Sequence, residues 1–454
     1  MKDLPSSVDF RRNSIDALSD TSTRNALRNA TSRFVRLRGE AVSAAPEIEA
    51  WRDAASAVRS KVLDNLWEYV DRFARNATKA GAIVHRAGDG QAAVEIIGNI
   101  LKDRGARKVV KSKSMVSEEV HLNAYLEKEQ IQVVETDLGE YIVQLADEPP
   151  SHILAPAVHK SRQQVGRLFA ERLGVDYSDD PTLLTKIARQ ALRKEFLSAD
   201  AGISGVNFAI ADTGSITLFT NEGNGRMVTT VPPLHVAILS VEKMLPSFAD
   251  LVLLMRLLPR CASGQTLSSY FSVITGTRKP GEATGADELH IVLLDNGRSE
   301  IVKGRCREIL KCIRCAACMN VCPVYVSIGG HAYASTYPGP MGIVLTTLIR
   351  GMEESHQLLD ASTLCGACEE VCPVRIPLVK LLHNLREERA EKGLTPSLER
   401  TAMKAYGTAV ESPALFSLGQ SGTRLLWGAL SPSGKGGALG RLPRPASRPF
   451  RKRW

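Results

Sequence analysis

Residues 82–137 read AIVHRAGDGQAAVEIIGNILKDRGARKVVKSKSMVSEEVHLNAYLEKEQIQVVETD, in which short β-branched runs alternate with longer segments of helical periodicity. The runs at 82–87, 108–113 and 131–137 predict strands, and the segments at 90–105 and 117–130 predict helices. This alternating order predicts an α/β domain with a mostly parallel sheet. Further strands and helices follow at 208–220, 231–245 and 288–297, so we expect the α/β domain to span residues 81–300.

The first 80 residues have the periodicity of helices. The segment 51–81 places apolar residues in one stripe at helical spacing, and Gly81 follows it as the expected C-cap. The stripe consists of Val58, Val62, Leu66, Val70 and Phe73. We therefore expect a helical N-terminal region over residues 1–80.

Two cysteine runs further along the chain align position for position. Residues 312–323 read CIRCAACMNVCP and residues 362–373 read STLCGACEEVCP, with Ser362 at the position of Cys312. The spacing C-x2-C-x2-C-x3-C-P is typical of proteins with two iron–sulfur clusters, in which the fourth cysteine ligates the other cluster. Crossing the runs in this way predicts two clusters of the 4Fe-4S type. The ligands would be Cys312, Cys315, Cys318 and Cys372 for the first cluster, and Cys322, Cys365 and Cys368 for the second.

The second cluster lacks one cysteine ligand. Its fourth iron could be open, could be lost to leave a three-iron cluster, or could be capped by Ser362, Cys306 or a group of a partner, although oxygen is a harder ligand than sulfur. Zinc sites also use pairs of CxxC, but three cysteines two residues apart followed by C-P are more specific for iron–sulfur. The remaining Cys261 is expected to be an ordinary core residue.

The cysteine runs belong to a region, 301–390, that we expect to be an α-helical ferredoxin-like iron–sulfur domain. Between the runs, residues 341–354 (MGIVLTTLIRGMEE) predict an amphipathic helix, which a compact β-rich ferredoxin would not contain. Residues 391–454 predict a helical C-terminal extension that ends in a basic, disordered tail. Residues 431–454 hold seven basic and no acidic residues, and removing them from the net charge of +9 leaves +2.

Composition limits the class of protein. The 454 residues correspond to about three domains, and 44% hydrophobic with 24% charged residues is ordinary for globular proteins. No apolar run approaches the roughly 18 residues of a transmembrane helix, and no apolar signal-peptide region is visible. Clustered CxxC spacings in a long chain favour metal ligation in a reducing compartment. We expect a cytoplasmic protein with at most peripheral membrane contact.

Polar segments follow predicted strands. The turn at Asp212 and the loop with Asn221 and Glu222 form a possible ligand or partner loop, because ligands bind at strand ends in open α/β sheets. The alternative is a hairpin whose glycines serve only backbone conformation. The sequence GNG at 223–225 lacks the third Gly or Ala of the dinucleotide-binding fingerprint. The lysines of KSK at 111–113 could bind an anion, but we expect them to be exposed to solvent.

Taken together, five segments resemble the lactate utilization protein B family. They are KSKSMVSEEVHLN (111–123), TDLGEYIVQLADEPPSHILAPAVHK (136–160), GISGVNFAIADTGSITLFTNEGN (202–224), CIRCAACMNVCPVY (312–325) and STLCGACEEVCPVRIPL (362–378). Many redox proteins share the cysteine runs, but their combination with the third segment is specific. The resemblance implies an LUD-type α/β domain, an iron–sulfur domain and a C-terminal extension. It also implies two partner subunits, A and C, with which L-lactate is oxidised to pyruvate. One departure is Ala316, where Cys-Gly-X-Cys is usual, and alanine is sterically tolerable there.

These observations predict an electron-transfer subunit. Lactate oxidation releases two electrons, and iron–sulfur cubanes pass them singly, so a flavin or nicotinamide must split the pair. We find no fingerprint of either in this chain, whose clusters would then relay electrons between a substrate-oxidising centre and an acceptor. Three alternatives remain open: a subunit for another 2-hydroxy acid such as glycolate, an iron–sulfur regulatory or nucleic-acid-binding protein, and an α/β domain that oxidises the substrate itself. The balanced charge of the chain body argues against nucleic acid.

Overall fold

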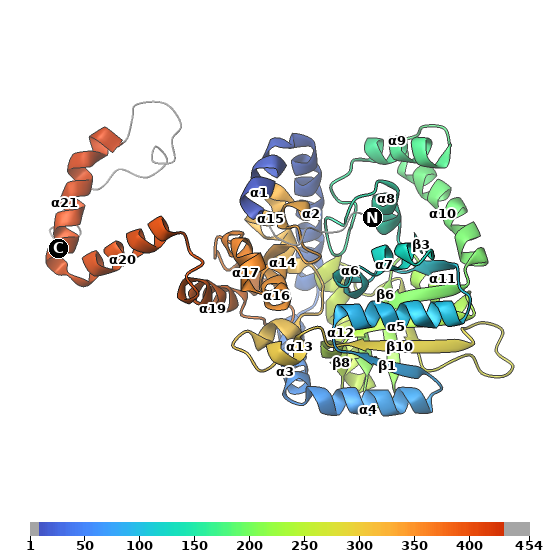
Figure 1. The fold of residues 1–454 in the computed structure, drawn as a ribbon. Helices are drawn as coiled ribbons and strands as arrows, with labels where there is room; N and C mark the ends of the chain where they lie inside the picture. The colour runs from blue at the N-terminus through green and yellow to red at the C-terminus, as the bar shows by residue number, and fades with distance from the viewer. Residues whose placement is uncertain (1–8, 431–454) are drawn as a thin grey trace. The chain divides into compact units, whose positions relative to one another are not determined.

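The computed structural model describes residues 9–430 (Figure 1), so the predicted basic tail lies outside the described residues. The chain divides into two compact units, residues 1–386 and 387–454. Within the described residues no helix combines the length and the apolar character needed to cross a membrane.

Six parallel strands form the larger sheet of the first unit, in the order β1-β10-β7-β4-β2-β3. The strands are β1 (Ile83–Ala87), β2 (Lys108–Lys111), β3 (Gln132–Glu135), β4 (Ala201–Gly205), β7 (Leu234–Ser240) and β10 (Glu288–Leu294). The chain runs from β2 to β3 at one edge of the sheet, and then from β4 through β7 to β10 in the opposite direction, toward the edge strand β1. The direction of winding therefore reverses between β2 and β4. The predicted α/β class with a mostly parallel sheet is confirmed.

A second sheet of four strands, which the sequence did not predict, has the order β8-β5-β6-β9. Its strands are β5 (Phe208–Ile210), β6 (Ser215–Thr220), β8 (Met244–Leu245) and β9 (Tyr270–Ile274). Strands β5 and β6 pair antiparallel around a tight turn, in which Gly214 has a φ of 70° that favours glycine. The hairpin alternative for this segment is thus correct as to its shape.

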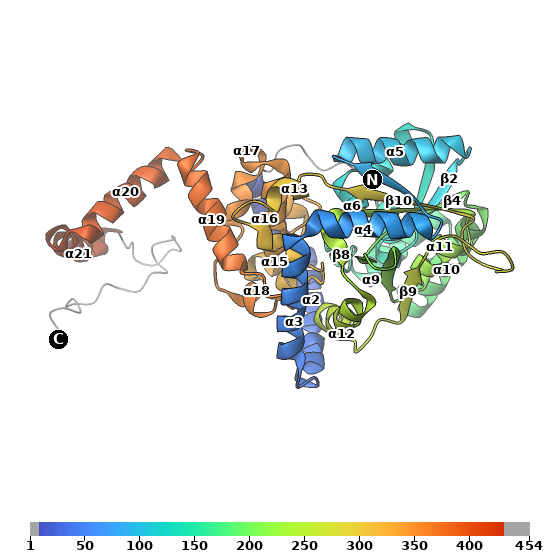
Figure 2. The same cartoon turned by 90° about the horizontal axis from the view of Figure 1, so that it is seen from below.

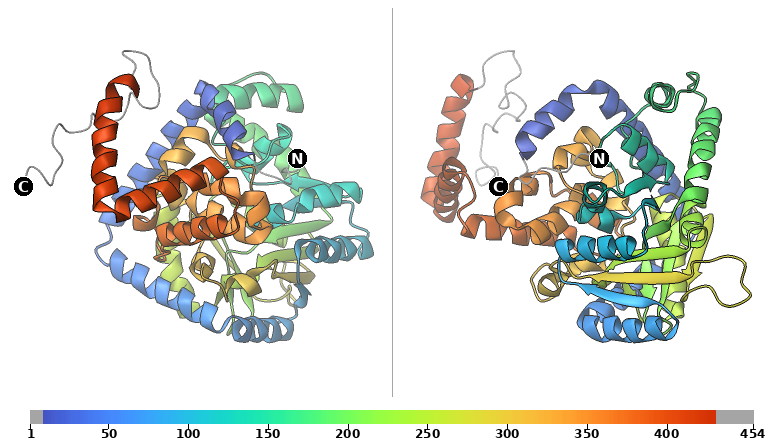
Figure 3. Two further views of the ribbon diagram at one scale, coloured as in Figure 1. Left: turned by 60° about the vertical axis from the view of Figure 1, so that its left-hand side comes forward. Right: turned by 45° about the vertical axis from the view of Figure 1, so that its right-hand side comes forward.

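Alternating side chains of the parallel strands enter two different cores. Val109 and Val292 pack with Ile97 of α5 (Gly90–Asp103) on one face of the sheet. Ile291 packs with Phe73 of α4 (Leu66–Lys79) on the other face. The right-hand view of Figure 3 shows the strands between these two blue helices. Because successive side chains point to opposite faces and both faces are buried, the parallel strands read as continuous apolar runs.

Further helices cover the rest of the sheet. The helices α7 (Leu122–Lys128), α8 (Leu138–Leu145), α9 (Arg162–Leu173), α10 (Pro181–Ser198) and α11 (Asn224–Thr230) contribute buried residues to these cores or to a third one beside β2 and β3. The prediction of a single helix over residues 117–130 is wrong. The segment forms two helices, α6 (Met115–Glu119) and α7, because His121 adopts a left-handed conformation with φ 53° between them.

The N-terminal region is helical, as expected, with α1 (Phe10–Ser19), α2 (Thr21–Ser43), α3 (Ile48–Asp64) and α4. Figure 2 shows α2 and α3 beside α12 (Phe248–Ala262) of the α/β region. Helix α2 also packs against two short helices of the cysteine region, α14 (Ala317–Asn320) and α15 (Pro323–Ile328). The N-terminal helices therefore contact both the α/β region and the cysteine region.

The cysteine region consists of short helices. They are α13 (Arg298–Ile301), α14, α15, α16 (Gly339–Arg350), α17 (Met352–Ser355), α18 (Ala367–Glu370) and α19 (Leu378–Glu391), with 3-10 turns at Arg307–Lys311, His331–Tyr333 and His356–Asp360. The amphipathic helix expected over 341–354 is wrong in two respects. Residues 339–347 of α16 are all buried, and the helix ends before Gly351, whose φ is 94°.

The second unit contains α20 (Ser397–Glu411) and α21 (Pro413–Leu430), so the predicted extension is helical over the described residues.

Candidate iron–sulfur centre and adjoining cavity

The two cysteine runs repeat one backbone conformation. In the first run Arg314 and Ala316 have φ angles of 61° and 62°, and at the aligned positions of the second run Leu364 and Gly366 have 55° and 86°. Each run then continues into a one-turn helix, α14 or α18. The repeat seen in the sequence is therefore also a repeat of local structure.

Four thiols, those of Cys312, Cys315, Cys318 and Cys372, line one small pocket, which we call the first thiol pocket. The backbone N–H of Arg314 donates to Sγ of Cys312 at 3.4 Å. The pocket is closed by apolar side chains, among them Ile153, Ile313, Met341, Val374, Ile376 and Leu378. Soft thiolates, backbone N–H groups and an apolar shell suit an iron–sulfur cluster. Among the described residues, no three His, Cys, Asp or Glu side chains converge as they would on a single metal ion.

Burial disfavours the charged form of these thiols. Burial and the neighbouring Cys312 raise the pKa of Cys372 to about 11. Burial and neighbouring thiols also raise the pKa values of Cys315 and Cys318 well above the usual range. Because a cysteine must lose its proton to ligate metal, these sulfurs need a positively charged group to hold them as thiolates.

A second set of thiols reaches the surface. Cys322 and Cys368 are 5% and 7% exposed, whereas Cys365 is exposed. Burial, together with the nearby Cys322 and Cys365, raises the pKa of Cys368 to about 12. These three cysteines are thus close enough to influence one another, and one of them faces solvent.

Ser362 has the local geometry of a cysteine in the first run. Its Oγ accepts the backbone N–H of Leu364 at 3.2 Å, just as Sγ of Cys312 accepts that of Arg314. Arg386 donates to the backbone carbonyl of Ser362 at 2.8 Å. The serine oxygen therefore stands where the repeat has a sulfur.

The other two cysteines lie outside the runs. Cys306 is buried, and its Sγ lies 3.9 Å from the carbonyl oxygen of Leu381. Cys261 is buried in α12, as expected of a core residue. The pKa of Cys315 is raised mainly by burial and next by the neighbouring Cys261.

Arginines of α3 hold the backbone of the cysteine region. Arg59, which is 1% exposed, donates to the carbonyl oxygens of Lys311 and Met244 at 3.3 and 2.9 Å. Arg52 donates to the carbonyl oxygen of Cys372 at 3.0 Å. These bonds satisfy buried carbonyl groups and connect the N-terminal helices to both neighbouring regions.

His152 provides another connection, from the loop after α8 to the first run. Its Nδ1 accepts the backbone N–H groups of Leu154 and Ala155 at 2.9 and 3.0 Å, so the proton lies on Nε2, which is 3.0 Å from Oδ1 of Asn320. Burial lowers the pKa of His152 to about 4, so the imidazole is neutral at physiological pH.

A cavity of about 360 Å³, which we call the sheet-edge cavity, opens at the carboxyl ends of the parallel strands. Residues 112–115 after β2, residues 205–207 at the end of β4 and Lys243 after β7 contribute to its wall. Strands β2 and β4 are the neighbours between which the winding direction reverses, and such a switch point leaves a crevice where ligands bind.

The structure brings two of the three predicted loop residues to this cavity. Asn221 and Glu222 line it, and Oε2 of Glu222 accepts the backbone N–H of Leu138 at 2.9 Å. Asp212 instead lies at the β5–β6 turn, where its carboxylate pairs with Arg72 of α4 at 3.1 Å.

The lysines after β2 differ from the expectation of solvent exposure. Lys111 is fully buried, and its Nζ lies 2.8 Å from the carboxylates of Glu118 and Glu135. Lys113 is half-buried, lines the sheet-edge cavity and donates to the carbonyl oxygen of Leu154 at 2.7 Å. The expectation of exposure is wrong because β2 lies inside the sheet, with strands on both sides.

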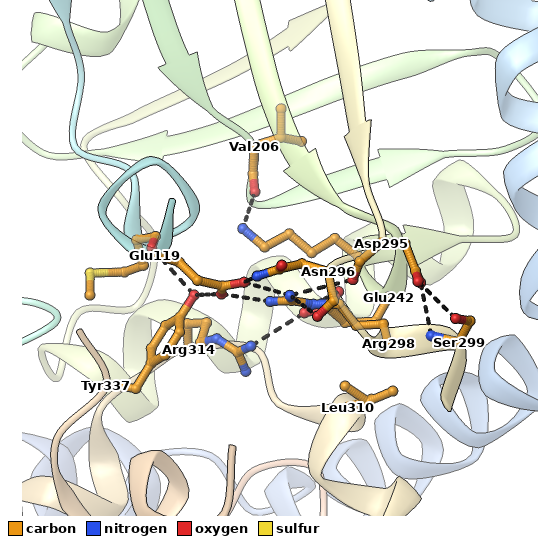
Figure 4. Close-up of polar contacts among 12 residues, drawn as sticks. Glu119, Val206, Glu242, Asp295, Asn296, Arg298, Ser299, Leu310, Arg314 and Tyr337 are labelled. Carbon is orange, nitrogen blue, oxygen red and sulfur yellow. Dashed lines mark hydrogen bonds and ion pairs between the residues drawn. The ribbon is translucent and has the colours of Figure 1, made fainter. Parts of the chain in front are cut away.

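A buried network of charged groups lies between the sheet edge and the first cysteine run (Figure 4). Arg298 pairs with Glu119 at 2.5 Å and with Glu242 at 3.3 Å, and Tyr337 donates to Glu119 at 2.7 Å. Nη2 of Arg314 lies 3.3 Å from Glu242. Burial alone would raise the pKa of Glu242, but Arg298 and Arg314 lower it to about 2. The network is therefore ionised at neutral pH.

Sequence reasoning missed Arg314, Lys243 and Arg298. Arg314 carried a usable signal, because a cation inside the run CIRC must lie beside the thiols. Lys243 and Arg298 have no such signal in the sequence, because only the packing of α13 near the end of β7 brings them together.

The sequence of this chain matches known protein families. The family model described as LUD domain matches residues 70–294, and the model described as 4Fe-4S dicluster domain matches residues 308–376. The chain is 46% identical over 412 residues to "Lactate utilization protein B" of Bacillus licheniformis. The aligned residues are 90% of this chain and 86% of that protein. The chain is 45% identical over 412 residues to the protein of the same name from Bacillus subtilis, with the same coverage of 90% and 86%.

Two other matches have different names. "Uncharacterized electron transport protein YkgF" of Escherichia coli is 44% identical over 414 residues, which are 91% of this chain and 87% of that protein. A crystal structure of a duf162 family protein from Deinococcus radiodurans covers 50% of this chain and 98% of that one, with 13% identity and a TM-score of 0.29.

Proposed function

Because this chain belongs to the lactate utilization protein B family, we propose that it is the iron–sulfur electron-transfer subunit of a complex that oxidises L-lactate to pyruvate. The observation that carries the proposal is the first thiol pocket, in which cysteines from both runs meet. The name electron transport protein, carried by the Escherichia coli relative, supports the same role.

In this proposal two 4Fe-4S clusters are bound. Cys312, Cys315, Cys318 and Cys372 hold the first, and Cys322, Cys365 and Cys368 hold the second, with Ser362 at the fourth position. Bound clusters supply one-electron transfer. Cys306 is the less favoured fourth ligand, because it lies outside the repeated geometry that Ser362 shares with Cys312.

The chain's own residues position these ligands. The arginines of α3 fix the carbonyl groups of the cysteine region, and the buried network of Glu119, Arg298, Glu242 and Arg314 supports the first run from the sheet side. The exposed Cys365 places the second set of thiols where a partner can approach. Subunits of the A and C type are the proposed partners, and one of them would carry the centre that splits the electron pair.

The test is purification of the complex under anaerobic conditions, with iron, sulfide and flavin analysis of each subunit. We expect about eight irons on this chain, which corresponds to two four-iron clusters. The isolated chain should not reduce an artificial dye with L-lactate, whereas the complex should. Turnover by the isolated chain would overturn the electron-relay role, and a zinc-loaded chain would overturn the cluster assignment. Glycolate in place of lactate distinguishes the alternative 2-hydroxy acid.

A further inference from the structure

The sheet-edge cavity and the first thiol pocket share a wall. Ile153 lines both. Arg314 also lines the cavity, and its backbone N–H donates to Sγ of Cys312. A molecule in the cavity would therefore be separated from the thiols only by the residues of this shared wall.

The charged side chains of the cavity favour an anion. Lys113, Lys243 and Arg314 contribute three cationic groups, and Asp137 and Glu222 contribute two carboxyl groups. Each lysine ammonium has three N–H groups, and Lys243 uses one to donate to the carbonyl oxygen of Val206 at 2.7 Å. The lysines therefore retain hydrogen-bonding capacity after their bonds to the protein backbone.

Arg314, which lines this cavity, has a buried donor without a partner. Its side chain is 10% exposed, its Nη2 lies 3.3 Å from Glu242, and its guanidinium group lies 5.1 Å from the ring centre of Tyr337. Its Nη1 is buried and has no hydrogen-bond partner among the described residues. A buried donor without a partner is costly, so an acceptor that reached this nitrogen would be stabilised. On the other side the guanidinium group has Cys312 as a neighbour.

The surroundings keep the guanidinium group fixed. Glu242, which accepts from Arg314, is itself held by Arg298, and Arg298 is held by Glu119 (Figure 4). A planar guanidinium in a fixed orientation matches the two oxygens of a carboxylate. The rest of the wall combines hydroxyl and amide groups with apolar side chains, namely Ser112, Ser114, Asn207, Leu218, Phe219 and Leu258.

We propose that the sheet-edge cavity binds a short-chain 2-hydroxy or 2-oxo carboxylate, with its carboxylate on Arg314 and its C2 oxygen toward the lysines and the polar wall. The anion site rests on the geometry of the cavity alone. The choice of a 2-hydroxy or 2-oxo acid rests on the proposed function. The α/β region of this chain thus presents a small organic acid directly beside the first set of thiols.

The experiment is isothermal titration of the anaerobically purified, iron-loaded full chain with pyruvate, L-lactate and inorganic phosphate. We expect one pyruvate or lactate per chain and much weaker binding of phosphate. Arg314→Met should weaken pyruvate binding about tenfold to a hundredfold, the usual effect of losing a charged hydrogen bond. Arg104→Met is the matched control, because Arg104 pairs with Glu288 on the surface and should leave binding unchanged.

A second variant distinguishes a loss of binding from a loss of folding. Lys113→Gln changes a half-buried side chain on another part of the wall, and it should weaken pyruvate binding about tenfold while iron content is retained. Pyruvate should also change the EPR spectrum of the reduced wild-type chain, and this change should be lost in both variants.

Three results would overturn the proposal: no binding of either acid to the wild-type chain, unchanged binding by both variants, or phosphate binding as tight as that of pyruvate. These results are independent of turnover. A complex that oxidises lactate although this chain binds no acid would overturn only the cavity assignment. A chain that binds pyruvate in a complex without lactate oxidation would overturn only the proposed function.

Discussion

Ala316 is a residue whose backbone conformation suits glycine better. Its φ of 62° lies in the left-handed region, where the aligned residue of the second run is Gly366. A Cβ atom in this conformation costs roughly 1–2 kcal/mol. We expect Ala316→Gly to raise the free energy of unfolding by about 1 kcal/mol, measured from the denaturant midpoint of the anaerobic chain.

The neighbouring alanine provides the control with the opposite sign. Ala317 begins α14, so Ala317→Gly should lower the free energy of unfolding by about 0.5–1 kcal/mol. Equal losses of stability in both variants would show that the left-handed conformation at Ala316 carries no strain.

Ser362 provides a prediction about the second cluster. If its oxygen leaves one iron exchangeable, mild oxidation of the wild-type chain should produce the EPR signal of a three-iron cluster, because oxygen binds such iron less well than sulfur does. Ser362→Cys should suppress the signal, and Ser362→Ala should retain it. A wild-type chain as resistant to oxidation as the cysteine variant would contradict the idea.

His235 on β7 makes stability depend on pH. It is 1% exposed, its Nε2 lies 2.8 Å from Oγ of Ser204, and burial lowers its pKa to about 3. Because the folded pKa lies below the unfolded value of about 6.5, stability is retained above pH 6.5 and lost as the pH falls toward 3. Between pH 7 and pH 5 this residue should cost the wild type about 2 kcal/mol.

The measurement is the free energy of unfolding of the wild type and of His235→Gln at both pH values. The advantage of the wild type over the variant should shrink by about 2 kcal/mol on acidification. His383→Gln, at an exposed position, is the control. An advantage that stays constant with pH would refute the role of His235.

At the scale of elements, helix α3 is attached to the cysteine region through buried arginines. Arg59→Met would leave the carbonyl groups of Lys311 and Met244 without their charged donor. Each such bond contributes about 1.5–3 kcal/mol, so we expect a loss of stability on the order of 3 kcal/mol in urea unfolding. Arg36→Met on α2 removes an arginine that is 62% exposed in a surface ion pair, and it should change stability by no more than about 0.5 kcal/mol. Similar losses in the two variants would refute the bridging role.

For the whole molecule, removal of iron should increase hydrogen exchange more in helix α3 than in helix α5 of the first unit. Hydrogen exchange should increase in α3, because Arg52 and Arg59 bind carbonyl groups beside the thiols. It should change little in α5, which packs on the far side of the parallel sheet among apolar residues. An equal increase in both helices, or none in α3, would show that the cysteine region does not support the N-terminal helices.

The sequence by itself determined the class of the fold and the chemistry of the cysteine runs. Period-two and period-3.6 apolar patterns are local properties, so the parallel strands and the N-terminal helices were predictable. The spacing of the cysteines likewise predicted iron–sulfur ligands. Local patterns failed where one residue changed the backbone direction, as His121 does between α6 and α7, or where burial on all sides hid the period, as in α16.

Only the tertiary structure decided the second sheet, the sheet-edge cavity and the charges around it. Arg298 and Glu119 lie 179 residues apart, and Arg314 and Glu242 lie 72 apart, yet each pair is in contact. No local period relates such residues, because only the packing of segments that are far apart in the sequence brings them into contact. The unsatisfied nitrogen of Arg314 is likewise a property of the packed molecule, since it depends on which acceptors the fold brings within reach.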